Sequence, residues 1–143
     1  MSGETTALQF VDTNVLIYAH DRSAGRKHEV ARILVGKLWD ARVGCLSIQV
    51  LQEFYVTVTQ KITQPLQRDE AVVIIQDLQF WTTHSPKTAD ILDAIALQQT
   101  YRLSFWDAMV IQSAMNLHCS QILSEDLNHG QRFGEVQVVN PFL

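Results

Sequence analysis

The chain has 143 residues, a formal net charge of −4 and a hydrophobic content of 47%, values typical of a globular protein rather than a disordered or fibrous one. No apolar run approaches the roughly 20 residues of a membrane-spanning helix, and the negative charge argues against broad, non-specific nucleic-acid binding through a basic face. We therefore expect one domain over residues 1–143, without membrane association.

The N-terminus and the cysteines bear on the cellular compartment. Residues 1–6 contain no basic segment followed by an apolar one, so we predict no secretory signal and interpret them as a short lead-in. Cys45 and Cys119 lie in apolar surroundings, and neither belongs to a closely spaced metal-binding group. We interpret both as buried free thiols, which indicates a reducing compartment and therefore a cytoplasmic protein.

Short segments rich in strand formers alternate with longer segments of helical periodicity. In chain order we predict a strand over 8–11, helices over 13–20 and 26–41, a strand over 42–46, helices over 48–61 and 68–80, a strand over 81–84, helices over 86–101 and 105–118, and strands over 120–124 and 136–139. Polar segments at 21–25, 63–67 and 125–133 are predicted loops. Strands that alternate with helices pair in parallel through right-handed crossovers. The pattern predicts an α/β three-layer sandwich with a central, mainly parallel five-stranded sheet flanked by helices.

Asp12 lies between the first predicted strand and the first predicted helix. In open α/β sheets, ligands bind at the carboxyl ends of the strands, which makes Asp12 a candidate site residue. Asp is also a good N-cap, so this position alone leaves a purely structural role open.

Asp107 is expected in the first turn of helix 105–118. On a helical wheel it falls within an apolar face that also includes Trp106 and Ile111, where an unpaired carboxylate is costly. The segment from Ser104 to Asp107 also fits a capping box, so capping remains an alternative to a site function.

Two further acids share this topological setting. Asp126 follows strand 120–124, where an Asx turn is the alternative, and Glu53 lies off the apolar face of helix 48–61, where a solvated surface accounts for it. If these acids converge with Asp12 and Asp107, their mutual repulsion requires a counter-ion. Mg²⁺ and Mn²⁺ suit carboxylate and water ligands, and one or two ions are compatible with four acids.

Four segments resemble, in the same order, the motifs of PIN-domain ribonucleases, and most closely those of the VapC-like toxins of bacterial and archaeal toxin–antitoxin pairs. The segments are 10–14, 52–54, 103–108 and 123–127. The resemblance implies an Mg²⁺- or Mn²⁺-dependent endoribonuclease whose catalytic and metal-binding acids are Asp12, Glu53, Asp107 and Asp126. It also implies that Thr13 and Asn14 support Asp12, and that Ser124 hydrogen-bonds near the site.

The resemblance further implies an RNA substrate, a homodimer and a small antitoxin protein that occupies the active-site groove. Asp126 is preferred to its neighbour Glu125 because it falls two residues after Ser124, as in the family pattern; roles for Glu125 and His129 stay open. RNA contacts are expected from basic residues in or beside loops next to the proposed edge, with ordinary surface charge as the alternative for each. These residues are Arg22, Arg26, Lys27 and Arg132.

Two other functions remain open at this point. The first is a non-catalytic PIN-like module that binds RNA or protein, although all four acids of the family pattern are present. The second is a phosphatase of the haloacid dehalogenase type with Asp12 as nucleophile. That chemistry favours a second Asp where this chain has Asn14, and no later lysine motif is evident. The RNA target is not specified by the sequence, because such specificity depends on loop shape.

Overall fold

The computed structural model describes residues 7–143, so the lead-in expected over residues 1–6 lies outside the described part. The elements in chain order are β1 (Gln9–Val11), α1 (Thr13–His20), the 3₁₀-helix η1 (Arg22–Ala24), α2 (Arg26–Ala41), β2 (Gly44–Ser47), α3 (Ile48–Gln60), α4 (Arg68–Leu78), β3 (Thr82–His84), α5 (Thr88–Tyr101), α6 (Phe105–Asn116), β4 (Gln121–Leu123), β5 (Arg132–Phe133) and β6 (Val136–Val139). None of the helices in this part of the chain combines the length and the hydrophobicity that a membrane span requires.

Polar side chains cap three of the helices. Asp12 accepts a hydrogen bond from the backbone N–H of Thr13 at the start of α1. Ser47 caps α3 by accepting from the N–H of Val50, and Ser104 caps α6 by accepting from the N–H of Asp107 at 3.1 Å. Each cap satisfies a backbone donor that has no partner inside its own helix.

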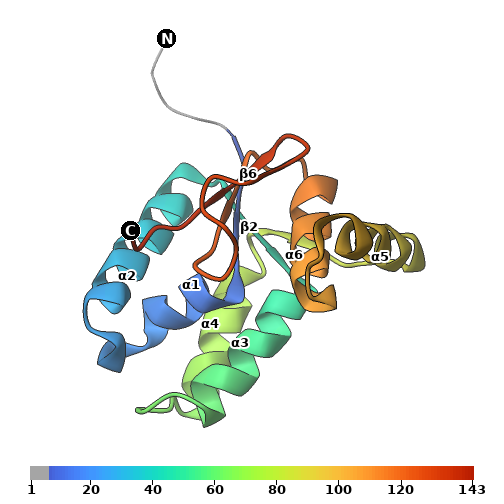
Figure 1. Cartoon of the computed structure of the whole chain (residues 1–143). Coiled ribbons are helices and arrows are strands. Elements are labelled where there is room, and N and C mark those ends of the chain that lie inside the picture. The colour runs from blue at the N-terminus through green and yellow to red at the C-terminus, as the bar shows by residue number, and fades with distance from the viewer. Residues whose placement is uncertain (1–6) are drawn as a thin grey trace.

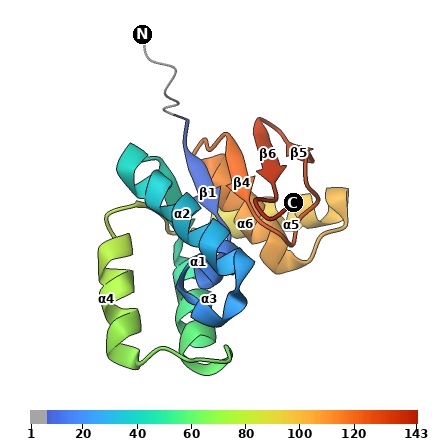
Figure 2. The same cartoon turned by 90° about the vertical axis from the view of Figure 1, so that its left-hand side faces the viewer.

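Six strands of the described chain form one sheet in the order β3-β2-β1-β4-β6-β5, in which only the β5–β6 pair is antiparallel. From β1 the chain moves outward through β2 to β3, and then crosses back to β4 on the other side of β1. The order therefore reverses between β1 and β4, which lie side by side in Figure 2. This reversal is the topological switch point at which open α/β sheets bind ligands.

Helices cover both faces of the sheet, because the two directions of winding place their crossovers on opposite sides. Figure 1 shows α1 and α2 on one side and α5 and α6 on the other. The centre of the sheet is apolar: Phe10 and Val11 of β1 and Ile122 of β4 are fully buried. A strand buried on both faces positions the residue that follows it rigidly, and in β1 that residue is Asp12.

The predicted fold class is confirmed, but the sheet has six strands rather than five. The additional strand, β5, lies within the predicted loop 125–133. It forms a hairpin with β6 through a two-residue loop in which Gly134 has φ +61, a conformation that glycine adopts without strain. A strand of two residues is too short to produce an alternating sequence pattern, so periodicity did not reveal it.

Two local predictions were also wrong. Helix α5 begins at Thr88 rather than at residue 86, because Asp90 accepts a hydrogen bond from the N–H of Lys87 and closes the first turn there. Trp106 does not belong to the buried face of α6, since it is 62% exposed. By contrast, Cys45 and Cys119 are buried free thiols, as predicted.

Candidate active site

Asp12 lies at the carboxyl end of β1, at the switch point, and is only 6% exposed. Its two carboxylate oxygens have different partners. Oδ1 accepts the capping bond from the N–H of Thr13 at 2.7 Å, and Oδ2 accepts from the hydroxyl of Ser124 at 2.7 Å. Asp12 is therefore both the N-cap of α1 and part of a hydrogen-bond network that extends to the end of β4.

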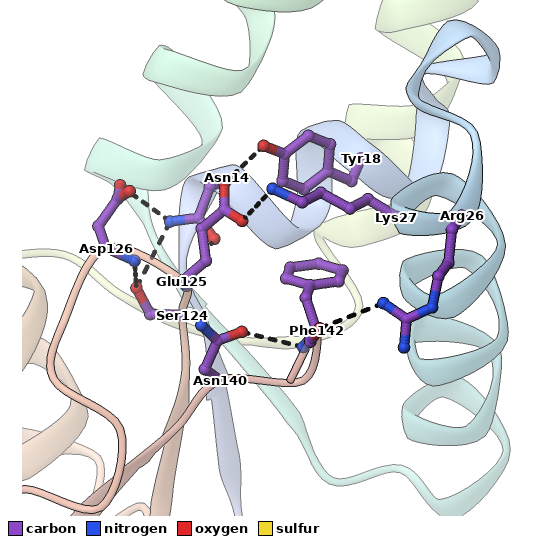
Figure 3. Close-up of polar contacts among 9 residues, drawn as sticks. All are labelled: Asn14, Tyr18, Arg26, Lys27, Ser124, Glu125, Asp126, Asn140 and Phe142. Carbon is purple, nitrogen blue, oxygen red and sulfur yellow. Dashed lines mark hydrogen bonds and ion pairs between the residues drawn. The ribbon is translucent and has the colours of Figure 1, made fainter.

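The side-chain amide of Asn14 connects the two strand ends. Its Nδ2 lies 3.3 Å from Oδ2 of Asp12 and 3.1 Å from Oδ2 of Asp126, and its Oδ1 accepts from the backbone N–H of Glu125 at 3.2 Å. Ser124 strengthens the connection, because its hydroxyl oxygen accepts from the N–H of Asp126 at 3.1 Å. Figure 3 shows the side chain of Asn14, a residue of α1, directed toward Ser124 and Asp126. Asp12 and Asp126 thus converge on one amide group.

Asp107 reaches the same region from the first turn of α6. Burial, together with the negative charges of Asp126 and Asp107, raises the pKa of Asp12 to about 6, although its hydrogen bonds to Ser124 and Thr13 act in the opposite direction. The pKa of Asp107 is raised as well, chiefly by burial and further by the charge of Asp126. Three of the four predicted acids are therefore close enough to influence one another electrostatically.

Glu53, the fourth predicted acid, is exposed on α3. Its Oε1 accepts from Nε2 of Gln49 at 2.7 Å, and the same amide nitrogen lies 3.4 Å from the backbone carbonyl oxygen of Trp106. These contacts lead to the first turn of α6, next to Asp107, and not to Asp12 or Asp126. Glu53 therefore lies near Asp107 but does not contact Asp12, Asp107 or Asp126.

The chemistry of the donor set fits a hard divalent cation, because carboxylates supply oxygen ligands and carry excess negative charge. Two buried side-chain oxygens at this edge, Oγ1 of Thr13 and Oε1 of Gln49, have no hydrogen-bond partner among the described residues. Within residues 7–143, however, no three His, Cys, Asp or Glu side chains already form a group that encloses a metal ion. Instead, Nδ2 of Asn14 contacts both Oδ2 of Asp12 and Oδ2 of Asp126.

The expected RNA-contacting residues lie in different surroundings. Arg22, in η1, lines a cavity of about 570 Å³ at the end of α1. The other titratable side chains that line this cavity are His20, His28, Arg32 and the acidic Glu70. Arg132 lies on β5 opposite Gln137, which pairs with Gln121 at the start of β4, so Arg132 is at the other end of the strands from Asp126. Arg132 therefore does not lie beside Asp12, Asp107 or Asp126.

Arg26 and Lys27, at the start of α2, are engaged in contacts within the chain. Nη1 of Arg26 donates to the backbone carbonyl of Phe142 at 3.2 Å, and Nζ of Lys27 forms an ion pair with Oε2 of Glu125 at 2.8 Å. These contacts hold α2 against the C-terminal segment and the loop after β4.

The sequence prediction missed Tyr18 and Gln49 and left Glu125 and His129 without a role. Tyr18 donates a hydrogen bond to Glu125, and Nδ1 of His129 accepts from the N–H of Asn140 at 3.0 Å, which ties the loop after β4 to the end of β6. Tyr18 and Gln49 follow Asp12 and Ser47 on helices that begin at the ligand-binding edge, and this position was the only available signal for them.

Comparison with known proteins identifies the family and the fold. The chain matches the PIN-domain family over residues 10–133, and it therefore belongs to that family. Its fold is similar to that of a chain in a toxin–antitoxin complex from Klebsiella pneumoniae, with a TM-score of 0.68, 17% identity, and coverage of 94% of this chain and 98% of the other. It is also similar to the sarcin–ricin-loop-cleaving toxin VapC20 of Mycobacterium tuberculosis, with a TM-score of 0.61, 16% identity, and coverage of 80% and 86%. No curated protein matches the sequence significantly.

Proposed function

We propose that this PIN-domain chain is an Mg²⁺- or Mn²⁺-dependent endoribonuclease that acts as the toxin of a toxin–antitoxin pair. The observation that carries the proposal is the environment of Asp12, a buried carboxylate at the switch point whose pKa is raised to about 6 by burial and by the charges of Asp126 and Asp107. Such a group needs either protons or a cation to relieve its repulsion, and a divalent cation also serves phosphodiester chemistry.

Each residue of the site has a role in this proposal. Asp12, Asp107 and Asp126 would hold the ion, with Glu53 at the margin. The N–H of Thr13 and the hydroxyl of Ser124 fix the two oxygens of Asp12, while Asn14 keeps Asp126 facing Asp12. When bound, the ion lowers the pKa of a bound water and offsets the charge that develops on the phosphate during hydrolysis.

The proposed substrate is RNA, approached from the cavity at the end of α1. Arg22 places positive charge in that cavity, which suits the RNA backbone, whereas Arg32 pairs with Glu29 at 2.9 Å and Glu70 adds negative charge. The similar toxin from Mycobacterium tuberculosis is described as cleaving the sarcin–ricin loop, so a structured RNA hairpin of this kind is the first substrate to test. A cognate antitoxin protein, a homodimer and a cytoplasmic location belong to the same proposal, and similarity to a toxin–antitoxin complex supports the antitoxin.

Two alternatives were open from the sequence. Membership of the PIN-domain family removes the basis for the phosphatase. The non-catalytic binding module is separated from the nuclease by an RNA cleavage assay with Mg²⁺, Mn²⁺ or EDTA, using Asp107→Asn and, as a matched control, Asp93→Asn on the exposed surface of α5. The proposal predicts cleavage that requires the ion, is abolished by Asp107→Asn and survives Asp93→Asn. Absence of cleavage by the folded wild type supports the binding module, and equal cleavage in EDTA or by Asp107→Asn contradicts the mechanism.

A further inference from the structure

Glu125 is the neighbour of Asp126 in sequence, but its carboxylate points away from the other acids. Figure 3 shows it directed toward Tyr18 and Lys27, which lie on α1 and α2. Oε2 accepts from Nζ of Lys27 at 2.8 Å, and Oε1 accepts from the hydroxyl of Tyr18. The side chain of Glu125 is 19% exposed and that of Lys27 is 43% exposed, so water is largely excluded from the carboxylate but reaches the lysine.

Lys27 is held in place by more than its ion pair. Its ammonium group lies 5.1 Å from the ring centroid of Tyr18 and 5.8 Å from that of Phe142, within the range of cation–π attraction. The two rings pack edge to face, with centroids 5.2 Å apart. Contacts with two rings and a carboxylate give Lys27 a structural role in joining the start of α2 to Glu125 and the C-terminal segment.

The backbone of Glu125 links this contact to Asn14, whose amide contacts Asp12 and Asp126. Its N–H donates to Oδ1 of Asn14 at 3.2 Å, and this bond decides which end of the Asn14 amide faces the acids. With Oδ1 bound to Glu125, Nδ2 faces Asp12 and Asp126 as a donor. A rotated amide would present its oxygen to two carboxylates, which is electrostatically unfavourable.

We propose that Glu125, anchored by Lys27 and Tyr18, is a positioning residue that orients the Asn14 amide and thereby holds Asp12 and Asp126 in the arrangement that binds the divalent ion. The catalytic consequence rests on the proposed function, whereas the orientation of Asn14 does not. This role for Lys27 differs from the RNA contact expected from the sequence, and the two roles predict different experimental results.

Conservative variants isolate the contact without removing the packing around it. Tyr18→Phe removes only the hydroxyl, and Lys27→Met removes the charge while keeping an unbranched side chain beside the rings. Lys37→Met, at an exposed position on the same helix, is the matched control for loss of one positive charge. The reversal Lys27→Glu breaks the pair, and Lys27→Glu combined with Glu125→Lys restores it with opposite polarity.

The first measurement needs neither metal nor RNA. The side-chain NH₂ resonances of Asn14, assigned by their loss in Asn14→Ser, report its hydrogen bonding in NMR spectra recorded in EDTA. The proposal predicts that these resonances shift in Tyr18→Phe, Lys27→Met and Lys27→Glu, keep their wild-type positions in Lys37→Met, and return toward them in the charge-swapped pair. Unchanged Asn14 resonances in Lys27→Glu would overturn the proposal whether or not the protein is a nuclease.

The second measurement separates positioning from RNA binding. Disturbing groups that orient metal ligands typically weakens metal binding by about tenfold or more, so Lys27→Met should raise the Kd for Mn²⁺ by about that factor and lower kcat with little change in KM for RNA. The swapped pair should recover most of the Mn²⁺ affinity. A raised KM with unchanged Mn²⁺ affinity would instead show that Lys27 contacts RNA and would overturn the positioning role. If the wild type cleaves no RNA, the proposed function fails, while the Asn14 resonances still decide the inference.

Discussion

The hydroxyl of Ser124 donates a 2.7 Å hydrogen bond to Oδ2 of Asp12, and this bond joins the carboxyl ends of β4 and β1 across the switch point. Ser124 is fully buried, and its oxygen also accepts from the backbone N–H of Asp126. One hydroxyl therefore fixes the positions of two acids that are distant in sequence.

Replacing Ser124 with Ala should destabilise the protein, because the substitution leaves the buried carboxylate of Asp12 without one of its donors. Removing one partner of a buried hydrogen bond costs about 1–3 kcal/mol, and we expect a decrease of this size in the free energy of unfolding measured with urea. Ser85→Ala, at an exposed position before α5, should change stability by less than about 0.5 kcal/mol. Equal effects of the two substitutions would show that the Ser124–Asp12 bond contributes nothing.

The raised pKa of Asp12 predicts a pH dependence of stability in the absence of divalent ions. Burial raises this pKa from 3.8 to about 6, so the folded state binds the proton more tightly than the unfolded state does. The resulting stabilisation is fully present below the unfolded pKa and is lost as the pH rises through the folded pKa. At about 1.4 kcal/mol per pKa unit the whole effect is about 3 kcal/mol, of which about 2 kcal/mol lies between pH 4.5 and 7.5.

Urea unfolding of the wild type and Asp12→Asn in EDTA measures this effect as a difference, which cancels the titration of the other groups. The wild type should lose about 2 kcal/mol relative to Asp12→Asn between these two pH values. Millimolar Mn²⁺ at pH 7.5 should then raise the stability of the wild type but not that of Asp12→Asn, because a ligand stabilises only the form that binds it. A constant difference across the pH range would contradict the raised pKa.

The positions of the arginines predict which of them affects RNA binding. Arg22→Ala should raise KM several-fold with kcat unchanged and reduce the salt dependence of RNA binding by about one ion, because one phosphate contact is lost. Arg132→Ala removes the same charge at the opposite end of the strands and serves as the control. A larger effect of Arg132→Ala than of Arg22→Ala in binding titrations at several salt concentrations would contradict the proposed RNA path.

Gly44 and Gly36 should respond in opposite directions to replacement by Ala. A Cβ atom at Gly44 of β2 would lie 2.5 Å from the ring of Trp81, so Gly44→Ala forces a buried aromatic side chain to move and should cost about 1–3 kcal/mol. Gly36 lies inside α2 with no atom near its Cβ position, and Gly36→Ala should stabilise the protein by roughly 0.5–1 kcal/mol. Thermal and urea unfolding of both variants test the packing of β2 against Trp81, and stabilisation by Gly44→Ala would contradict it.

The elements that carry the site were predictable from local sequence. An apolar run followed by Asp12 and a helical pattern gave the boundaries of α1 as the structure has them, because the strand, the cap and the helix are all encoded within a dozen residues. The prediction for Asp12 left capping and a site role as alternatives, and the structure shows the cap on Oδ1 and contacts with Asn14 and Ser124 on Oδ2.

The contacts between distant segments were not predictable in this way. Lys27 and Glu125 are 98 residues apart, and no local pattern reveals that they form an ion pair instead of facing RNA. Arg132 illustrates a second cause, because the hairpin of β5 and β6 was missed and the residue was therefore expected in a loop near the acids. Glu53 shows a third: a position near a strand end limits which edge a helical residue approaches, but not which neighbour its side chain binds.

In the proposed function, carboxylates from separate elements hold a divalent ion at the switch point. The most direct test is a crystal of the protein soaked in MnCl₂ and measured for anomalous scattering, with Asp12→Asn treated in the same way. We predict a manganese peak bounded by Asp12, Asp107 and Asp126 in the wild type, and no peak there in Asp12→Asn. A wild-type crystal with no manganese at this position, or with manganese bound equally in Asp12→Asn, would contradict the claim.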